Sequence, residues 1–123
     1  MTRKKTELKP VIGVVTYLAT LSNWVLANLL PDFGKPYADI KESDGTISRL
    51  FSASVNPNKL KWHMDDEDRI VKPLNPNNWQ FQLEDQLPVP LDQPIFIKRH
   101  QWHRLIKGDG PLIVNITKHA KRA

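Results

Sequence analysis

The segment Asn75–Leu83 has the sequence NPNNWQFQL and joins a turn to a strand. Its first four residues are asparagine and proline, which favour turns because proline restricts φ and asparagine side chains hydrogen-bond to nearby backbone. The last five alternate, with Trp79, Phe81 and Leu83 on one face and Gln80 and Gln82 on the other. Side chains two positions apart share a face of a strand. This alternation predicts a half-buried β-strand directly after the turn.

A period of two recurs over residues 46–118, which we interpret as one β domain. Seven short strands are expected, over residues 46–55, 60–64, 69–74, 79–83, 94–98, 102–106 and 112–117. Turn residues separate them, for example at 56–58 and 108–110. Short strands with intervening turns predict an all-β barrel or sandwich. No clear helix follows any of these strands, so a doubly wound parallel sheet is disfavoured.

The first 45 residues follow another pattern. A basic lead, residues 1–9, precedes a helix predicted over residues 11–30 from apolar side chains at spacings of three and four, Val14, Leu18, Leu21, Val25 and Leu29. Its first part, residues 11–17, is β-branched enough to begin as a strand instead. Pro31 disfavours helical backbone just before it, so the helix should end there. Residues 31–45 are expected to form an irregular arm, and residues 119–123 a basic tail.

The composition excludes several classes of site. The chain has 123 residues, the size of one domain, and contains no cysteine. Disulfides, thiol nucleophiles and cysteine-based zinc sites are therefore excluded. The formal net charge is +5, and basic residues crowd both ends. Such ends contact phosphates in some proteins and are merely solvated in others. No aromatic-basic RNA-binding motif supports a nucleic-acid role here.

Residues 11–30 carry no formal charge and are as long as a membrane span. Polar side chains reduce the apolar character of this stretch, namely Thr16, Thr20, Ser22, Asn23 and Asn28. We therefore expect a buried or interface-facing helix rather than a span. No signal peptide is expected, because no small-residue cleavage site follows the apolar run. The expected location is the cytoplasm, or the host cytoplasm or virion if the protein is viral.

Two segments, residues 62–69 and 94–108, resemble the two halves of the cupin double-stranded β-helix. His63 and Asp65 match the first cupin metal motif as His-x-Asp, and His103 matches the later lone histidine. The same order occurs in iron-dependent oxygenases of the related double-stranded β-helix class. Residues 79–88 and 102–108 also look like small uncharacterised cupin-like proteins of bacteriophages and cyanobacteria. The resemblance implies a mainly β fold, a small cupin-like barrel or jelly roll with one N-terminal helix and an irregular arm.

The sequence departs from the cupin pattern at Arg69, where a metal cupin usually has its glutamate. The Pro-x-Gly turn expected before the late histidine is replaced by Lys98-Arg99-His100. A guanidinium beside a dication is electrostatically unfavourable. Arg69 therefore favours an anion pocket or a structural ion pair over the full metal-cupin site.

The metal hypothesis rests on three side chains. His63 and Asp65 share a face of an extended chain because they are two positions apart, and closure of the barrel would add His103. Two imidazoles and one carboxylate form the facial triad of non-haem iron, and such a site could also bind manganese, nickel or zinc. The alternative is that no metal binds. Trp62 and Trp102 precede the two histidines, and if these large aromatics are core, both histidines face outward.

The arginines permit an anion-binding hypothesis. Arg69 and Arg104 could hold a carboxylate or phosphate through paired N–H groups. Gln80 and Gln82 could line the same polar pocket. The alternative is that the arginines pair with the acidic run at residues 65–68 on the surface, where ion pairs contribute little to stability.

Three functions remain open from the sequence. The first is a small cupin-like protein with a metal- or anion-binding pocket. The second is a non-enzymatic assembly protein, a viral or multisubunit component that forms oligomers through the N-terminal helix and arm. The third is a basic nucleic-acid accessory protein. Whether the protein is an enzyme stays open, because the chain has no nucleophile elbow and no glycine-rich phosphate loop.

Overall fold

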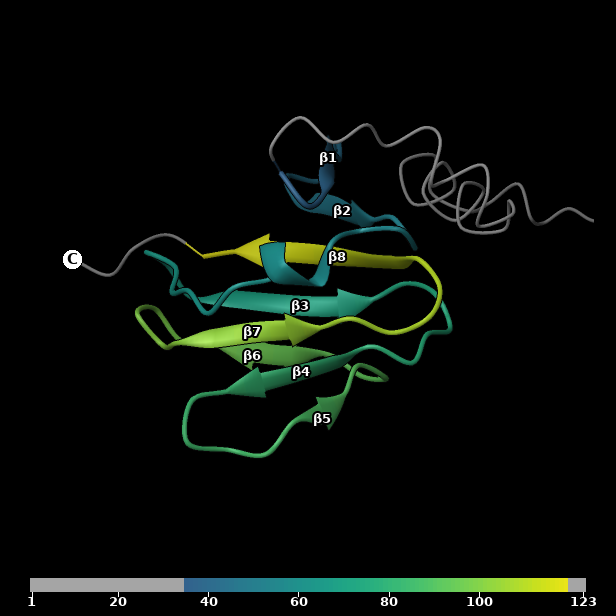
Figure 1. The fold of residues 1–123 in the computed structure, drawn as a ribbon. Helices are drawn as coiled ribbons and strands as arrows, with labels where there is room; N and C mark the ends of the chain where they lie inside the picture. Colours follow the sequence, from purple (N-terminus) through teal and green to yellow (C-terminus); the bar gives the residue numbers. More distant parts are fainter. Residues whose placement is uncertain (1–34, 120–123) are drawn as a thin grey trace, which may run out of the picture.

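The computed structural model describes residues 35–119, which form two antiparallel β-sheets (Figure 1). The larger sheet contains, in spatial order, β1 (Ala38–Lys41), β2 (Ile47–Phe51), β8 (Leu112–Lys118), β3 (Arg69–Pro73) and β6 (Ile95–Ile97). The smaller sheet contains β5 (Val89–Pro90), β4 (Gln80–Leu83) and β7 (His103–Ile106). A 3-10 helix, Pro57–Lys59, lies between β2 and β3. The described part of the chain is therefore mainly β, as the alternation predicts.

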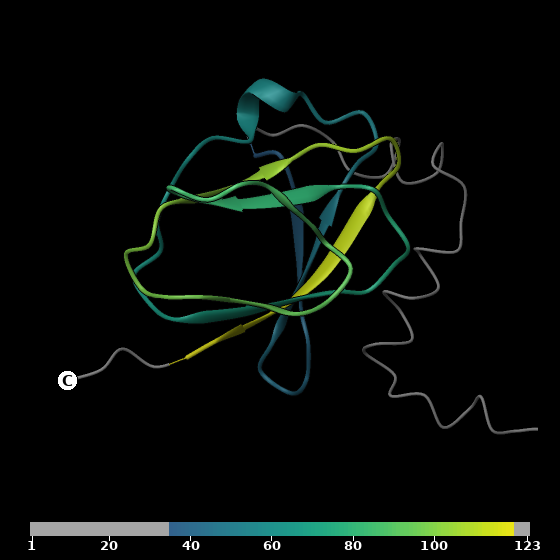
Figure 2. The same ribbon diagram turned by 90° about the horizontal axis from the view of Figure 1, so that it is seen from below.

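The two sheets face each other. Figure 2 shows β7 in one layer and β8, drawn in yellow, in the other. Side chains at alternate positions of both sheets line one cavity, for example Val114 and Ile116 on β8 of the larger sheet and His103 and Leu105 on β7 of the smaller sheet. The period of two thus directs one face of each strand towards a common interior.

The core joins both sheets. Its buried apolar side chains are Phe51, Val55, Trp79, Phe81, Leu91, Ile97, Leu112, Val114 and Ile116. Trp79 is only 1% exposed, and its indole Nε1 donates a hydrogen bond to the Gly110 carbonyl at 2.9 Å. A Cβ atom at Gly108 would lie 2.8 Å from Cδ1 of Trp79. Glycine is needed at this position because the indole packs directly against the backbone.

The predicted turn before β4 holds neighbouring segments in place. The Asn75 Oδ1 accepts a hydrogen bond from Ile113 N–H at 2.8 Å, which ties the turn to β8. The Asn77 Oδ1 accepts one from Trp79 N–H at 2.8 Å, and its Nδ2 donates to the Leu91 carbonyl at 3.0 Å. These amide side chains satisfy backbone groups that the sheets leave unpaired.

The structure differs from the expected strands in three places, one of which is β5, a strand that was not expected. Ala38–Lys41, within the arm expected to be irregular, forms β1 and pairs with β2. Residues 60–64, expected to be a strand, follow the 3-10 helix and contribute only an isolated bridge at His63. Asn56 favours that helix because its side chain accepts a hydrogen bond from Asn58 N–H.

The helix predicted over residues 11–30 lies outside the described residues. Within residues 35–119, no helix has the length and apolar character that crossing a membrane requires.

The alternative in which both tryptophans belong to the core is wrong. Trp62 and Trp102 are each 40% exposed, whereas His103 is 5% exposed. The inward face of β7 belongs to His103 and Leu105, which line the cavity. Trp79 and Phe81 supply the aromatic core instead, so the exposed tryptophans are not needed there.

We predict that Trp79→Ala lowers the free energy of unfolding by about 3–5 kcal/mol, because it removes a fully buried aromatic side chain and leaves a cavity. The matched variant Trp102→Ala should lower it by less, about 2 kcal/mol, because this side chain is 40% exposed. Urea unfolding of both variants measures the difference. A greater loss in Trp102→Ala than in Trp79→Ala would contradict the placement of the two side chains.

Candidate metal centre

Backbone hydrogen bonds hold His63 and His103 side by side. The His63 N–H donates to the His103 carbonyl at 3.0 Å, and the His103 N–H donates to the His63 carbonyl at 2.9 Å. This isolated bridge joins the loop before β3 to the start of β7. Residues directly opposite each other in an antiparallel pair project to the same side. The two imidazole centroids accordingly lie 4.3 Å apart.

Backbone carbonyls also determine the tautomer of each imidazole. Nδ1 of His63 lies 3.0 Å from the Lys61 carbonyl oxygen, and Nδ1 of His103 lies 2.7 Å from that of Gln101. A carbonyl oxygen only accepts hydrogen bonds, so each Nδ1 carries a proton. In a neutral ring the lone pair then lies on Nε2. Metal-binding histidines are commonly oriented in this way.

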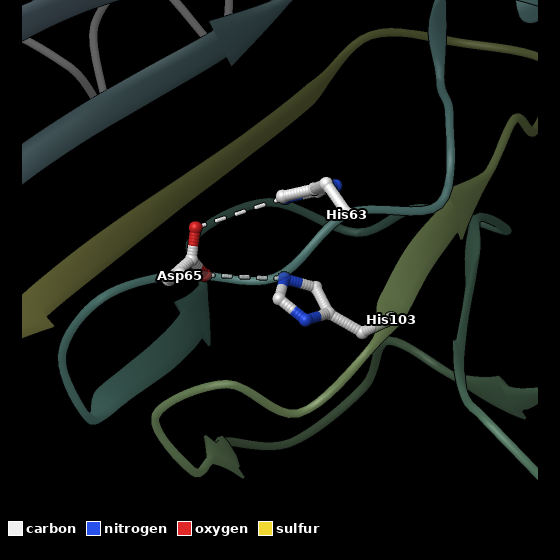
Figure 3. A group of neighbouring side chains, drawn as sticks. All are labelled: His63, Asp65 and His103. Carbon is white, nitrogen blue, oxygen red and sulfur yellow. Dashed lines mark ion pairs between the residues drawn. The ribbon is translucent and has the colours of Figure 1, made fainter.

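The Asp65 carboxylate faces both Nε2 atoms (Figure 3). Nε2 of His103 lies 3.2 Å from Asp65 Oδ2, and Nε2 of His63 lies 3.9 Å from Asp65 Oδ1. Asp65 Oδ2 is buried, and it can accept a hydrogen bond from His103 only when Nε2 of that imidazole is protonated. With both rings neutral, three electron-pair donors converge with no proton between them. Either a cation or an additional proton on an imidazole must occupy this position.

The acidic run has a structural role around Asp65. The Asp65 carbonyl accepts a hydrogen bond from His100 N–H at 2.8 Å, and Asp68 Oδ1 accepts one from Arg99 N–H at 2.8 Å. Nε2 of His100 lies 3.2 Å from Asp66 Oδ1. His100 has a φ of 65°, a conformation that favours glycine, at the turn where the cupin pattern has Pro-x-Gly. The turn between β6 and β7 therefore holds the acidic loop at the site.

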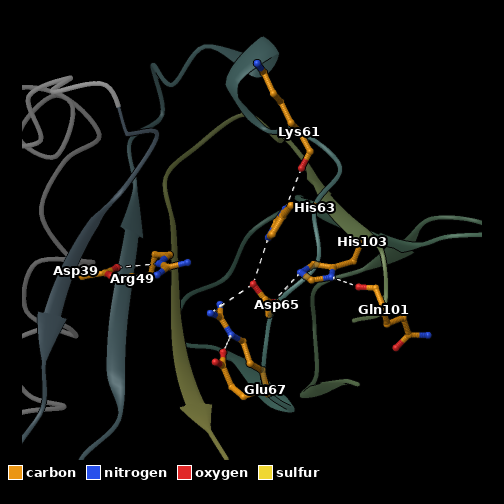
Figure 4. Close-up of polar contacts among 9 residues, drawn as sticks. Asp39, Arg49, Lys61, His63, Asp65, Glu67, Gln101 and His103 are labelled. Carbon is orange, nitrogen blue, oxygen red and sulfur yellow. Dashed lines mark hydrogen bonds and ion pairs between the residues drawn. The ribbon is translucent and has the colours of Figure 1, made fainter. Parts of the chain in front are cut away.

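Arg69 contacts both Asp65 and Glu67, which are labelled in Figure 4. Its Nη2 lies 3.4 Å from Asp65 Oδ1, and its Nε donates to Glu67 Oε2 at 2.6 Å. Burial raises the pKa of Asp65, but the hydrogen bond from His103 and the charge of Arg69, with smaller effects of the histidine charges, outweigh it. The pKa of Asp65 therefore lies below its ordinary value of 3.8. The carboxylate is ionised at neutral pH and available as a ligand.

The three side chains border a cavity of about 450 Å³. This volume lies in the range of small-molecule sites in proteins, roughly 300–1,000 Å³. Apolar side chains from both sheets form much of its wall, including Phe51, Phe81, Leu105, Val114 and Ile116. The core residues Trp79, Leu91 and Leu112 do not line it.

The geometry fits a single metal ion. One ligand atom each from His63, Asp65 and His103 lie within 4.8 Å of one another. Ligands bound at about 2.1 Å to one ion lie roughly 3–3.5 Å apart, so small side-chain rotations bring these atoms into place. Among residues 35–119, this is the one group of histidine and carboxylate side chains arranged to hold a metal.

The other predicted site residues are divided between two places. Arg69 lines the cavity, but Arg104, Gln80 and Gln82 do not. Nε of Arg104 donates to Gln82 Oε1 at 2.9 Å, and its guanidinium lies 4.8 Å from the centroid of the Trp62 ring. Gln80 is exposed. The predicted part of these three residues in ligand binding stays a prediction.

The sequence reasoning missed four cationic side chains that line the cavity: Lys59 and Lys61, which precede β3, and two on the strands, Arg49 and Lys118. The positions of Arg49 and Lys118 within their strands could have indicated that both side chains line the cavity. Arg49 shares the inward face of β2 with Phe51, and Lys118 continues the inward face of β8 after Ile116. Alternation alone therefore contained the signal, once the inward face of each strand was known.

Two solved structures are similar to this chain in fold, at low sequence identity. The DMSP lyase DddQ from Ruegeria pomeroyi DSS-3 is similar with a TM-score of 0.57 and 17% identity, over 85% of this chain and 57% of that chain. A structure of the DMSP lyases RdDddP and RnDddQII is similar with a TM-score of 0.53 and 12% identity, over 68% of this chain and 46% of that chain. No protein-family model and no curated protein matches the sequence. The chain spans about half the length of these solved structures, and the likeness supports a cupin-like fold.

We predict that acid removes a stabilising contribution of Asp65. A carboxyl group whose pKa is lower in the folded than in the unfolded chain stabilises the fold above its unfolded pKa, and this contribution is lost as the pH falls through the folded value. The free energy of unfolding of metal-free protein, relative to Asp65→Asn, should therefore decrease as the pH falls below 3.8. Urea unfolding of both proteins over a pH series measures it. A difference that grows in acid would contradict the lowered pKa.

Proposed function

We propose that this protein is a small metal-dependent cupin-like protein, which binds one divalent transition metal through His63, Asp65 and His103. The ion would lie beside a cavity large enough for a small organic ligand. One observation carries the proposal: with both rings neutral, the Nε2 lone pairs of His63 and His103 face the two oxygens of the buried Asp65 carboxylate, and one ligand atom from each residue lies within 4.8 Å of the others. Such an arrangement is unfavourable without positive charge between the three atoms.

The surrounding residues would prepare the ligands for the metal. Two imidazoles and one carboxylate leave coordination positions open, and iron, manganese, nickel and zinc suit this donor set. A bound ion supplies a Lewis acid that polarises an oxygen of the ligand. The Lys61 and Gln101 carbonyls orient the imidazoles, and Arg69 orients the carboxylate. The apolar side chains of the wall would lower the dielectric constant beside the ion.

The other predicted functions are less well supported. Assembly through the N-terminal helix and arm, and nucleic-acid binding by the basic ends, depend on residues 1–45 and 119–123. Most of these residues lie outside the described range. Both functions stay predictions.

We expect chelator-treated protein to bind one equivalent of at least one of these four ions. His63→Ala, Asp65→Asn and His103→Ala should each weaken this binding by about 100-fold or more, since changes even to the neighbours of metal ligands weaken binding 10–100-fold. Isothermal titration calorimetry measures the affinity. Proton release in buffers of different ionisation enthalpy shows whether an imidazole loses a proton on binding.

The matched control is His119→Ala, which removes an exposed histidine that does not line the cavity. Its metal affinity should equal that of the wild type. Failure of all four ions to bind, or an equal loss in His119→Ala and His103→Ala, would refute the proposed site.

Arg69 should oppose metal binding. Its guanidinium contacts the same Asp65 oxygen that faces His63, and its charge repels a dication. We expect Arg69→Gln to raise the metal affinity by about tenfold, as the repulsion between like charges at this range amounts to more than about 1 kcal/mol. Calorimetric titration tests this directly. Weaker binding in Arg69→Gln would instead mean that orientation of the carboxylate by Arg69 outweighs the repulsion.

A further inference from the structure

The cavity beside the candidate metal centre carries an excess of positive charge. Its lining contains five cationic side chains, Arg49, Lys59, Lys61, Arg69 and Lys118, and a single carboxylate, that of Asp65. The acidic partner of Arg49, Asp39, and one of the two acidic partners of Arg69, Glu67, do not line the cavity. The arginines therefore present their charge to the interior while these two partners lie outside it.

Arg49 is held rigidly for this role. Its Nε and Nη2 donate to the two carboxylate oxygens of Asp39 at 2.8 and 3.0 Å, and its guanidinium lies 3.8 Å from the centroid of the Tyr37 ring. The side chain is 13% exposed. A guanidinium has five N–H groups, and Asp39 engages only two of them. Figure 4 shows the remaining edge of Arg49 on the side where Asp65 lies.

Lys118 adds a second cation on the neighbouring strand. It lies opposite Arg69 in the pairing of β8 with β3 and follows Val114 and Ile116 on the inward face of β8. None of the ion pairs among residues 35–119 involves Lys118. Its ammonium group is therefore available to an anion that enters the cavity.

The remaining walls are apolar. Phe51, Leu60, Phe81 and Leu105 line the same cavity, which would accommodate a hydrocarbon portion of a ligand. Apolar walls also strengthen the attraction between a cationic side chain and an anion, since they exclude water between the charges.

We infer that the cavity binds a small organic acid, with an oxyanion group against Arg49, the additional positive charge of Lys118 on the same wall, and an apolar body against Phe51, Phe81 and Leu105. The oxyanion could be a carboxylate or a phosphate, because a guanidinium donates paired hydrogen bonds to both. The inference rests on the proposed function in using the same cavity. The cationic side chains are nevertheless present without a metal, so the two can be tested separately.

Three probes of matched hydrocarbon length test the inference: hexanoate, hexyl phosphate and neutral hexanamide. Each is titrated calorimetrically into the full chain, both chelator-treated and metal-loaded. In the metal-free protein, at least one acid should bind about tenfold more tightly than hexanamide, since a hydrogen bond between charged groups contributes about 1.5–3 kcal/mol. Comparison of the two acids identifies the preferred head group.

Charge-matched variants locate the anion. Arg49→Gln and Lys118→Gln should each reduce the preference for the acid over hexanamide severalfold. Lys72→Gln removes the same charge from an exposed position of β3 outside the cavity, and should leave the preference unchanged. High salt should weaken binding of the acids but not of hexanamide.

Two results would overturn the inference. One is an equal affinity, or no measurable affinity, for the acids and hexanamide in the metal-free protein. The other is an equal loss of preference in Lys72→Gln and Lys118→Gln, which would indicate net charge alone. If the acids bind only to metal-loaded protein and Arg49→Gln has no effect, the metal proposal stands and the anion site fails. If no metal binds but the protein still prefers the acids to hexanamide, the anion site stands and the metal proposal fails.

Discussion

The reciprocal backbone hydrogen bonds between His63 and His103 are the interaction on which the candidate site depends. They bring the loop before β3 against the first residue of β7, and thereby place two imidazoles from distant parts of the chain within contact distance. In each ring, Nδ1 donates a hydrogen bond to the carbonyl two residues earlier, which determines the tautomer. Asp65 follows two residues after His63 and is held by the turn that leads into β7. One main-chain bridge therefore organises all three donor side chains.

Arg69 places two requirements of the site in opposition. It neutralises and orients Asp65, which a buried carboxylate requires in the absence of a cation. The same charge disfavours a dication at that position, whereas together with Arg49 and Lys118 it favours an anionic ligand. Metal and anion would therefore be coupled, since each reduces the electrostatic penalty of the other. The arginine at the position of the usual cupin glutamate is best understood as part of a more cationic cavity.

Alternation along the chain was sufficient to predict a mainly β fold, and the strand after Asn75–Asn78 is confirmed. It also singled out His63, Asp65 and His103, which the structure brings together; metal binding by them stays a prediction. Alternation shows which side chains share a face but not which face is inside. The sequence therefore left open whether Trp102 or His103 faces inward, and it did not indicate that Arg49 lines the cavity. The loop at residues 60–68 could not be predicted, since its shape depends on contacts with the distant turn around His100.

The bridge between His63 and His103 consists entirely of main-chain atoms, which every amino acid except proline supplies in full. Exchange of either imidazole for another donor would thus alter the chemistry at the cavity without releasing the two segments that present it. During evolution, the fold could therefore keep this main-chain bridge while the residues at positions 63 and 103 change. Related chains could acquire a different ion, or lose metal altogether, while they keep the same architecture.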